Sequence, residues 1–219
     1  MGLRITQQHL AVTKSARLYT IGDVSTAEEV WIVCHGYGQL AGKFIRSFES
    51  IITQQRAIVA PEALHRFYLD PPLAPAAERR VGATWMTRED RDADIRDNVA
   101  YLDAVAVHAR GARPSRVRAF GFSQGCATIF RWAVLGATHV HELILWSGEV
   151  PPDLDLEQAK TRLANTRIAI VQGASDALMA ASVRDRELLG AAGIRHEYHE
   201  HAGGHRLDSH LLGVLAARI

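Results

Sequence analysis

The sequence has little of several features that assign a protein to a class at once. Its only 2 cysteines, Cys34 and Cys126, form no Cys-x-x-Cys pair, which excludes a disulfide framework. No apolar run approaches the roughly 18 residues of a membrane span, and no secretory signal peptide precedes the first apolar segment. The net charge is only +1, without the basic excess of a nucleic-acid-binding protein. We therefore expect no nucleic acid partner and no stable membrane anchoring, with the cytoplasm as the default compartment.

The composition is that of an ordinary globular protein. Apolar residues make up 47% of the 219 residues and charged residues 22%, which excludes a disordered chain, a collagen and a coiled coil. A chain of this length without repeats is expected to form one domain over residues 1–219. A homodimer is left open by the sequence.

Apolar segments of strand and helix type alternate from residue 30 to the end. Strands are predicted at residues 3–9, 17–21, 30–34, 57–60, 116–122, 143–146, 168–172 and 195–200, and helices at 44–52, 89–108, 126–135, 183–192 and 207–215. The first two strands are expected to pair as an edge hairpin, and residues 61–88 show no periodic element. The alternation predicts an α/β fold, a mostly parallel twisted sheet with helices on both faces.

A Gly-x-Ser-x-Gly pentapeptide, Gly121 to Gly125, lies between a predicted strand and a predicted helix. This context is typical of a nucleophile elbow, a turn so sharp that it forces its serine into a strained backbone conformation. Ser123 is therefore the candidate nucleophile. A serine hydroxyl needs a base to take its proton and a carboxylate to orient that base.

The order serine, acid, histidine along such a chain leaves few partners for Ser123. Asp176 follows the strand at 168–172, and His205 follows Gly203 and Gly204. Both are predicted to lie on loops at the sheet edge that also carries Ser123. Weaker alternatives stay open, and these are Asp153 and Asp155 for the acid and His201 for the base.

The oxyanion that forms during acyl transfer needs two backbone N–H donors. One is expected from Gln124, directly after the serine, and the other from Tyr37 in the glycine-rich loop after the strand at 30–34. His35, at the start of that loop, is expected to brace it.

Five motifs in this order resemble the phospholipase/carboxylesterase family of α/β-hydrolases. They are His35-Gly36-Tyr37-Gly38, Gly121-Phe122-Ser123-Gln124-Gly125, Trp146-Ser147-Gly148, Gly173-Ala174-Ser175-Asp176 and Gly203-Gly204-His205. The resemblance implies an α/β-hydrolase fold without a large cap, a Ser123–Asp176–His205 triad, and an oxyanion hole of Tyr37 and Gln124 N–H. It also implies hydrolysis of carboxylic esters or thioesters without a metal or organic cofactor. Residues 81–90 resemble a bacterial serine esterase subgroup within this family, which is related to the acyl-protein thioesterases.

Two positions depart from the family pattern, and both border the acyl site that the resemblance implies. Gln39 replaces a common aspartate, and Met179-Ala180 replaces a common Val-Pro pair. Candidate substrate-binding residues are Trp85, Met86, Trp146 and Met179, for which packing in the core is the competing interpretation.

The sequence thus predicts a carboxylesterase-type serine hydrolase acting on a small-molecule ester, with short to medium acyl chains, through an acyl-enzyme intermediate. The alternatives are a lysophospholipase, an acyl thioesterase, or a non-catalytic binding protein that has kept the α/β-hydrolase fold. His199 and His201 would share one strand face as metal ligands do. No carboxylate–histidine metal motif accompanies them, so we expect no metal.

Overall fold

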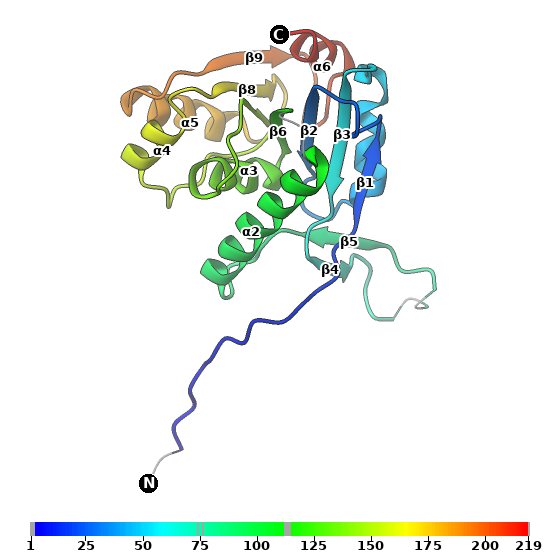
Figure 1. Ribbon diagram of the computed structural model, residues 1–219. Helices are drawn as coiled ribbons and strands as arrows, with labels where there is room; N and C mark the ends of the chain where they lie inside the picture. Colours follow the sequence, from blue (N-terminus) through cyan, green and yellow to red (C-terminus); the bar gives the residue numbers. More distant parts are fainter. Residues whose placement is uncertain (1–2, 74, 76, 112–114, 219) are drawn as a thin grey trace.

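A seven-stranded sheet forms the centre of the computed structural model, which describes residues 3–73, 75, 77–111 and 115–218 (Figure 1). Its strand order is β1-β3-β2-β6-β7-β8-β9. The strands are β1 (Leu18–Ile21), β2 (Glu29–Cys34), β3 (Arg56–Pro61), β6 (Arg116–Phe122), β7 (Glu142–Trp146), β8 (Arg167–Gly173) and β9 (Glu197–His201). All neighbouring pairs are parallel except β1 and β3. The predicted α/β-hydrolase architecture, a mostly parallel sheet without a large cap, is confirmed.

Helices cover both faces of this sheet, as the alternating pattern predicts. On one face lie α2 (Arg91–Arg110), α3 (Gln124–Leu135), α4 (Leu156–Arg162) and α5 (Met179–Ala191); on the other lie α1 (Ala41–Phe44), the 3₁₀ helix η1 (Ile45–Ile51) and α6 (Ser209–Ala216). In β2 the side chains divide between two cores, with Val30 and Ile32 in one and Trp31 and Val33 in the other. A strand buried on both faces needs a continuous apolar run, which is what β2 has. In the part of the chain that the structure describes, no helix is long and apolar enough to cross a membrane.

The predicted hairpin at the N-terminus is wrong. Residues 3–9 form no strand but an extended, exposed segment that leads away from the sheet (Figure 1, dark blue). Leu3 and Ile5 are almost fully exposed. The segment has the alternation of a strand, but no neighbouring strand covers its apolar side chains. β1 instead pairs with β3, with Leu18 opposite Pro61.

Residues 61–88, for which no element is predicted, contain a two-stranded antiparallel sheet. Its strands are β4 (His65–Tyr68) and β5 (Val81–Thr84). The connection between them includes positions 74 and 76, which lie outside the described residues. Both strands have only four residues, too few for the alternation to stand out from the surrounding loop.

Candidate active site

Ser123 occupies the turn between β6 and α3 in a strained backbone conformation. Its φ of 54° and ψ of −119° lie in a region that residues with a side chain rarely adopt. Two backbone hydrogen bonds hold the turn, from Ser123 N–H to the Trp146 carbonyl at 2.9 Å and from Cys126 N–H to the Ser123 carbonyl at 3.0 Å. The serine thus lies at the N-terminus of α3, where backbone N–H groups have no helical partner.

Glycines make this tight turn possible. A Cβ on Gly121 would lie only 2.5 Å from the backbone of Gly125, and a Cβ on Gly125 would overlap the Cys34 carbonyl. Gly148, after β7, lies so close that a Cβ there would overlap the Ser123 carbonyl oxygen. The two glycines of the pentapeptide therefore permit close backbone approach, as the elbow motif predicts.

His205 and Asp176 meet at the same edge of the sheet. The Nδ1 atom of His205 lies 3.0 Å from Oδ2 and 3.2 Å from Oδ1 of Asp176. The Asp176 side chain is completely buried, whereas that of His205 is 40% exposed. An ionised carboxylate only accepts hydrogen bonds, so Nδ1 is the nitrogen that donates, and Nε2 is left as a proton acceptor.

The environment of Asp176 favours its charged form. Burial alone would raise the pKa of this carboxyl, but the Leu178 N–H and His205 lower it below its ordinary value. The Leu178 N–H donates to Oδ1 at 2.9 Å. Asp176 therefore presents a fixed negative charge to His205.

Ser123 and His205 line one cavity of about 390 Å³. The other lining residues are Gly36, Tyr37, Gln39, Phe44, Ser47, Phe122, Arg206 and Leu207. The ring of Phe122 lies beside the ring of His205, with 4.9 Å between the centroids. A larger cavity of about 820 Å³ lies at the opposite edge of the sheet and contains neither Ser123 nor His205.

The loop after β2 is held so that two N–H groups remain open near Ser123. Gly36 N–H donates to the Gln39 side chain at 2.8 Å, and Gly38 N–H donates to the Ala83 carbonyl of β5 at 2.9 Å. Neither Tyr37 N–H nor Gln124 N–H donates a hydrogen bond to another described residue. These are the two amides that the sequence suggests for an oxyanion hole.

The side chain of Gln124 has a function that sequence reasoning missed. Its Oε1 accepts from Trp85 N–H at 3.1 Å, and its Nε2 donates to the Met86 carbonyl at 3.0 Å and to Thr84 Oγ1 at 2.9 Å. The residue after the serine is thus tied to the end of β5. The glutamine within the pentapeptide was the only sequence signal for this contact.

His35 braces the loop after β2 from within the core. Its Nε2 accepts from Ala63 N–H at 3.2 Å, so Nδ1 carries the proton and donates to the Gly36 carbonyl at 2.8 Å. Burial lowers the pKa of this histidine, which is therefore neutral and suited to both hydrogen bonds. Trp85 Nε1 donates to the His35 carbonyl at 2.8 Å.

The four candidate substrate-binding residues do not line the cavity of Ser123, as far as the described residues show. Trp85 and Trp146 are fully buried, and Trp146 Nε1 donates to the Arg206 carbonyl at 3.0 Å. Met86 is partly buried, with its sulfur 3.3 Å from Arg131 Nη1. Met179 begins α5 and lies beside the Tyr198 hydroxyl. Phe44 of α1 and Leu207, just before α6, supply apolar lining instead.

The alternative acid and base lie in other environments. Asp153 forms ion pairs with Arg131 at 2.7 Å and Arg91 at 2.6 Å. Asp155 caps α4 by accepting from Glu157 N–H at 2.9 Å. His201 is buried, and its Nδ1 accepts from Gly203 N–H at 3.1 Å.

The remaining candidate groups have structural surroundings. Cys34 and Cys126 are free thiols buried in the core, and burial raises the pKa of both. Among the described residues, no three His, Cys, Asp or Glu side chains are grouped in a way that could hold a metal ion.

Comparison with known sequences identifies the family of this chain. The sequence profile of the family described as Phospholipase/Carboxylesterase matches residues 20–218. The chain belongs to the phospholipase/carboxylesterase family. Membership in this family indicates a hydrolase. A comparison with curated protein sequences gives no match.

Solved structures similar to this phospholipase/carboxylesterase family member share its fold at low sequence identity. A carboxylesterase from Mesorhizobium loti has 18% identity and a TM-score of 0.69, with 93% of this chain and 95% of that chain covered. Zea mays acyl-protein thioesterase 2 has 16% identity and a TM-score of 0.68, with 92% and 96% covered. A phospholipase/carboxylesterase from Dyadobacter fermentans has 17% identity and a TM-score of 0.67, with 95% and 99% covered.

Proposed function

We propose that the protein is a serine carboxylesterase that hydrolyses small esters through an acyl-enzyme intermediate. One observation carries the proposal. The strained Ser123 shares a cavity with His205, whose Nδ1 contacts the buried carboxylate of Asp176. A nucleophile, a base and a group that orients the base are the parts that acyl transfer requires.

In the proposed reaction, His205 Nε2 takes the proton of the Ser123 hydroxyl as Oγ attacks the ester carbonyl carbon. The carbonyl oxygen becomes an oxyanion, which accepts hydrogen bonds from Tyr37 and Gln124 N–H. His205 then gives its proton to the leaving alkoxide, which departs as the alcohol. Removing one such N–H donor costs about 3 kcal/mol of transition-state stabilisation in other hydrolases.

Deacylation repeats the steps with water as the nucleophile. His205 takes a proton from water while the water oxygen attacks the acyl carbon, and it returns the proton to Ser123 Oγ as the carboxylic acid leaves. Asp176 keeps the Nδ1 proton of His205 in place during both halves of the reaction.

The dimensions of the cavity support short to medium acyl chains. Its volume of about 390 Å³ lies toward the small end of the ligand-pocket range of about 300–1,000 Å³. Gln39 and Ser47 add polar groups to the lining, beside the apolar Phe44 and Leu207. Activity on long-chain lysophospholipids or acyl thioesters is the second candidate, because Zea mays acyl-protein thioesterase 2 shares the fold.

The test is hydrolysis of p-nitrophenyl esters, from acetate to palmitate, by the wild type and by Ser123→Ala. We expect kcat to fall on the order of 10⁴–10⁶-fold in the variant, with the wild-type rate highest at acyl chains of medium length or shorter. Ser209→Ala makes the same chemical change at the exposed first residue of α6 and should keep the wild-type rate.

The remaining outcomes separate the alternatives. A maximum at palmitate would favour the lysophospholipase or thioesterase alternative over a small-ester carboxylesterase. Labelling by a fluorophosphonate, read by mass spectrometry, should place the adduct on Ser123. Equal rates in Ser123→Ala and wild type, or no hydrolysis and no labelling in either, would reject the proposed enzyme.

A further inference from the structure

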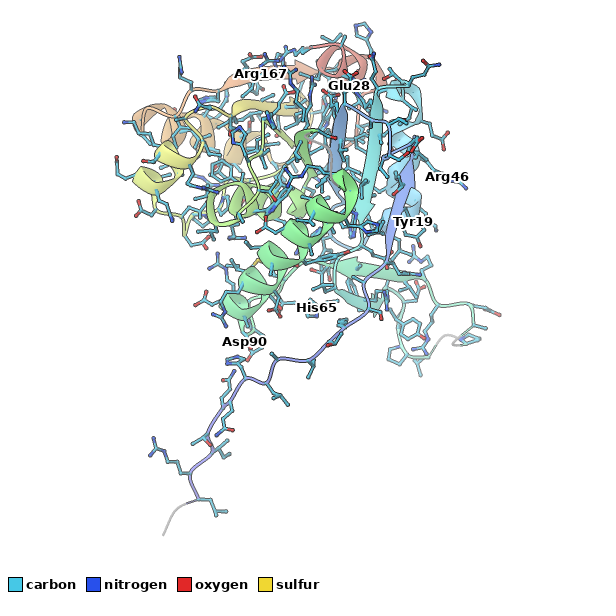
Figure 2. All side chains as sticks on the ribbon, viewed as in Figure 1. Tyr19, Glu28, Arg46, His65, Asp90 and Arg167 are labelled. Atoms are coloured by element: carbon cyan, nitrogen blue, oxygen red, sulfur yellow. The ribbon has the colours of Figure 1, made fainter. Side chains whose placement is uncertain are left out.

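A second cavity beside the sheet lies at the edge opposite Ser123, where the parallel strands begin. It has a volume of about 820 Å³ and is lined by the starts of β6, β7 and β8, by the end of α4 and by the turn before β9. In Figure 2, Arg167 and Glu28 mark this edge, and His65 and Asp90 lie at the far end of the molecule. The proposed esterase reaction uses none of the residues that line it.

Cationic side chains dominate this cavity. The charged lining residues are the cations Arg116, Arg118, Lys160, Arg167 and Arg195 and the anions Glu142 and Glu197. Both carboxylates already have partners, since Glu142 pairs with the buried Arg118 at 2.9 Å and Glu197 pairs with Arg218 at 2.6 Å. The cavity therefore has a clear excess of positive charge.

Three of these cations have no carboxylate partner among the described residues, and they come from three separate elements. Arg116 begins β6, Lys160 lies near the end of α4, and Arg195 follows the α5–β9 turn. Lys160 Nζ lies over that turn, 3.2 Å from the position that a Cβ on Gly193 would take. The ammonium group is thus held next to the segment that carries Arg195.

The surrounding groups respond to this positive charge. Burial lowers the pKa of His141, and His139, Arg116 and Arg110 lower it further. Burial also lowers the pKa of Arg118; Glu142 and Glu29 act to raise it, and Arg56 and Arg167 act to lower it. Of these cations, Arg116 and Arg167 line the cavity, and an anion placed there would offset the repulsion that Arg116 exerts on His141 and Arg167 exerts on Arg118.

We propose that this cavity binds a small anion with several phosphate groups, recognised through its phosphate chain. Arg116, Lys160 and Arg195 line one cavity from different elements, so we expect an elongated chain of phosphates to contact more of them than a single phosphate does. Arg and Lys are the side chains that proteins use most for phosphate contacts. The residues that line the cavity include no Phe, Tyr or Trp on which a nucleobase would stack.

The test is isothermal titration calorimetry, in which tripolyphosphate is added to the full chain at low ionic strength. We expect one site per chain, at least tenfold weaker binding of orthophosphate, and binding that weakens as salt is added. Adenosine triphosphate should bind about as tightly as tripolyphosphate, because only the phosphate chain is recognised. Binding of the nucleotide without binding of tripolyphosphate would overturn the proposal.

Matched charge reversals locate the site. Lys160→Glu combined with Arg195→Glu should weaken the binding of tripolyphosphate at least tenfold. The rate of ester hydrolysis should stay unchanged, which also shows that the variant is folded. Lys43→Glu with Arg46→Glu makes the same change at exposed positions of α1 and η1, and Arg46 lies away from the cavity in Figure 2. Equal weakening in both double variants, or no binding by the wild type, would show that the cavity is not a phosphate site.

Discussion

Two of the three described non-glycine residues with a positive φ lie at the proposed nucleophile or beside it, and the third, Asp90, precedes α2. Ser123, with a φ of 54°, and Ser147, with a φ of 50°, follow the neighbouring strands β6 and β7. Each such residue costs about 1–3 kcal/mol and persists only where its surroundings leave no alternative. Each serine is held by a backbone hydrogen bond to the next strand. Ser123 N–H donates to the Trp146 carbonyl, and Ser147 N–H donates to the Val171 carbonyl.

Gly148→Ala should disrupt this arrangement. The added Cβ would overlap the Ser123 carbonyl oxygen and the buried side chain of Cys126, whose Cβ would be only 2.6 Å away. We expect a loss of about 1–3 kcal/mol in the free energy of unfolding, as for other overpacked cores, and at least a tenfold fall in kcat for ester hydrolysis. Urea unfolding and the p-nitrophenyl ester assay measure the two effects.

Gly190→Ala is the matched control for this substitution. Gly190 lies in α5 with nothing within 4 Å of the position of its Cβ. Replacing a helical glycine with alanine stabilises by about 0.5–1 kcal/mol, so the control should gain stability at wild-type activity. A Gly148→Ala protein with wild-type stability and rate would contradict the close packing around the elbow.

The elements that the sequence predicts well are those buried on both faces of the sheet. β2, β7 and β8 have continuous apolar runs, β6 has one interrupted by Arg118, and the predicted and observed bounds of all four differ by one residue at most. The short α4 was not predicted, although Asp155 before Leu156 is a typical N-cap. For residues 3–9, in contrast, a strand is predicted and none forms. Their apolar residues alternate as in a strand, but no neighbouring strand pairs with them.

In the candidate site, the sequence predicts the positions of the catalytic residues better than the lining of the cavity. The order of strands and loops was enough to place Ser123, Asp176 and His205 at one edge, and the contact between His205 and Asp176 has the geometry that their proposed roles need. The residues that the sequence suggests for substrate binding do not line this cavity, because its lining depends on the direction of each side chain. Trp146 ends β7 but packs in the core with Phe120, with 5.7 Å between ring centroids.

The ion pairs of Asp153 join three segments that are distant in the sequence, and they should make stability depend on pH. Arg131 of α3 and Arg91 of α2 both contact its carboxylate. Although burial opposes ionisation, these arginines lower the pKa of Asp153 to about 2. A lowered pKa contributes stability above the unfolded pKa of about 4, and this contribution is lost as the pH falls toward 2.

Asp153→Asn should therefore lower the free energy of unfolding at pH 7 and leave little difference from the wild type near pH 2. The shift sets an upper limit of about 2 kcal/mol, which solvent screening reduces because the side chain is 30% exposed. Urea unfolding of both proteins at pH 7, 4, 3 and 2 gives the difference directly. A difference that stays constant over this range would show that the ion pairs do not set the pH dependence.

At the scale of the whole molecule, one sheet separates two cores that share its strands. The apolar residues of β2, β6, β7 and β8 alternate between the cluster under α2 and α3 and the cluster under η1 and α6. Neither core can lose its strands without exposing the other. This sharing of strands is the physical basis for expecting that the chain unfolds as one domain.

The four tryptophans provide the test, because they are buried and divide equally between the cores. Trp85 and Trp132 belong to the first cluster, and Trp31 and Trp146 belong to the second. We predict a single unfolding transition in which far-UV circular dichroism and tryptophan fluorescence have the same midpoint. At about 0.7 kcal/mol per residue, the 219 residues give an unfolding enthalpy near 60 °C of roughly 150 kcal/mol, with equal calorimetric and van't Hoff values.

Two double variants allow the unfolding of each core to be followed separately by tryptophan fluorescence. Trp31→Phe with Trp146→Phe leaves fluorescence only in the core under α2 and α3, and Trp85→Phe with Trp132→Phe leaves it only in the core under η1 and α6. Each double substitution is expected to lower stability, so the comparison is between fluorescence and circular dichroism within one variant. Coincident midpoints in both variants are expected from the shared strands. Separate midpoints in either variant would mean that the two cores unfold independently and that the sheet does not couple them.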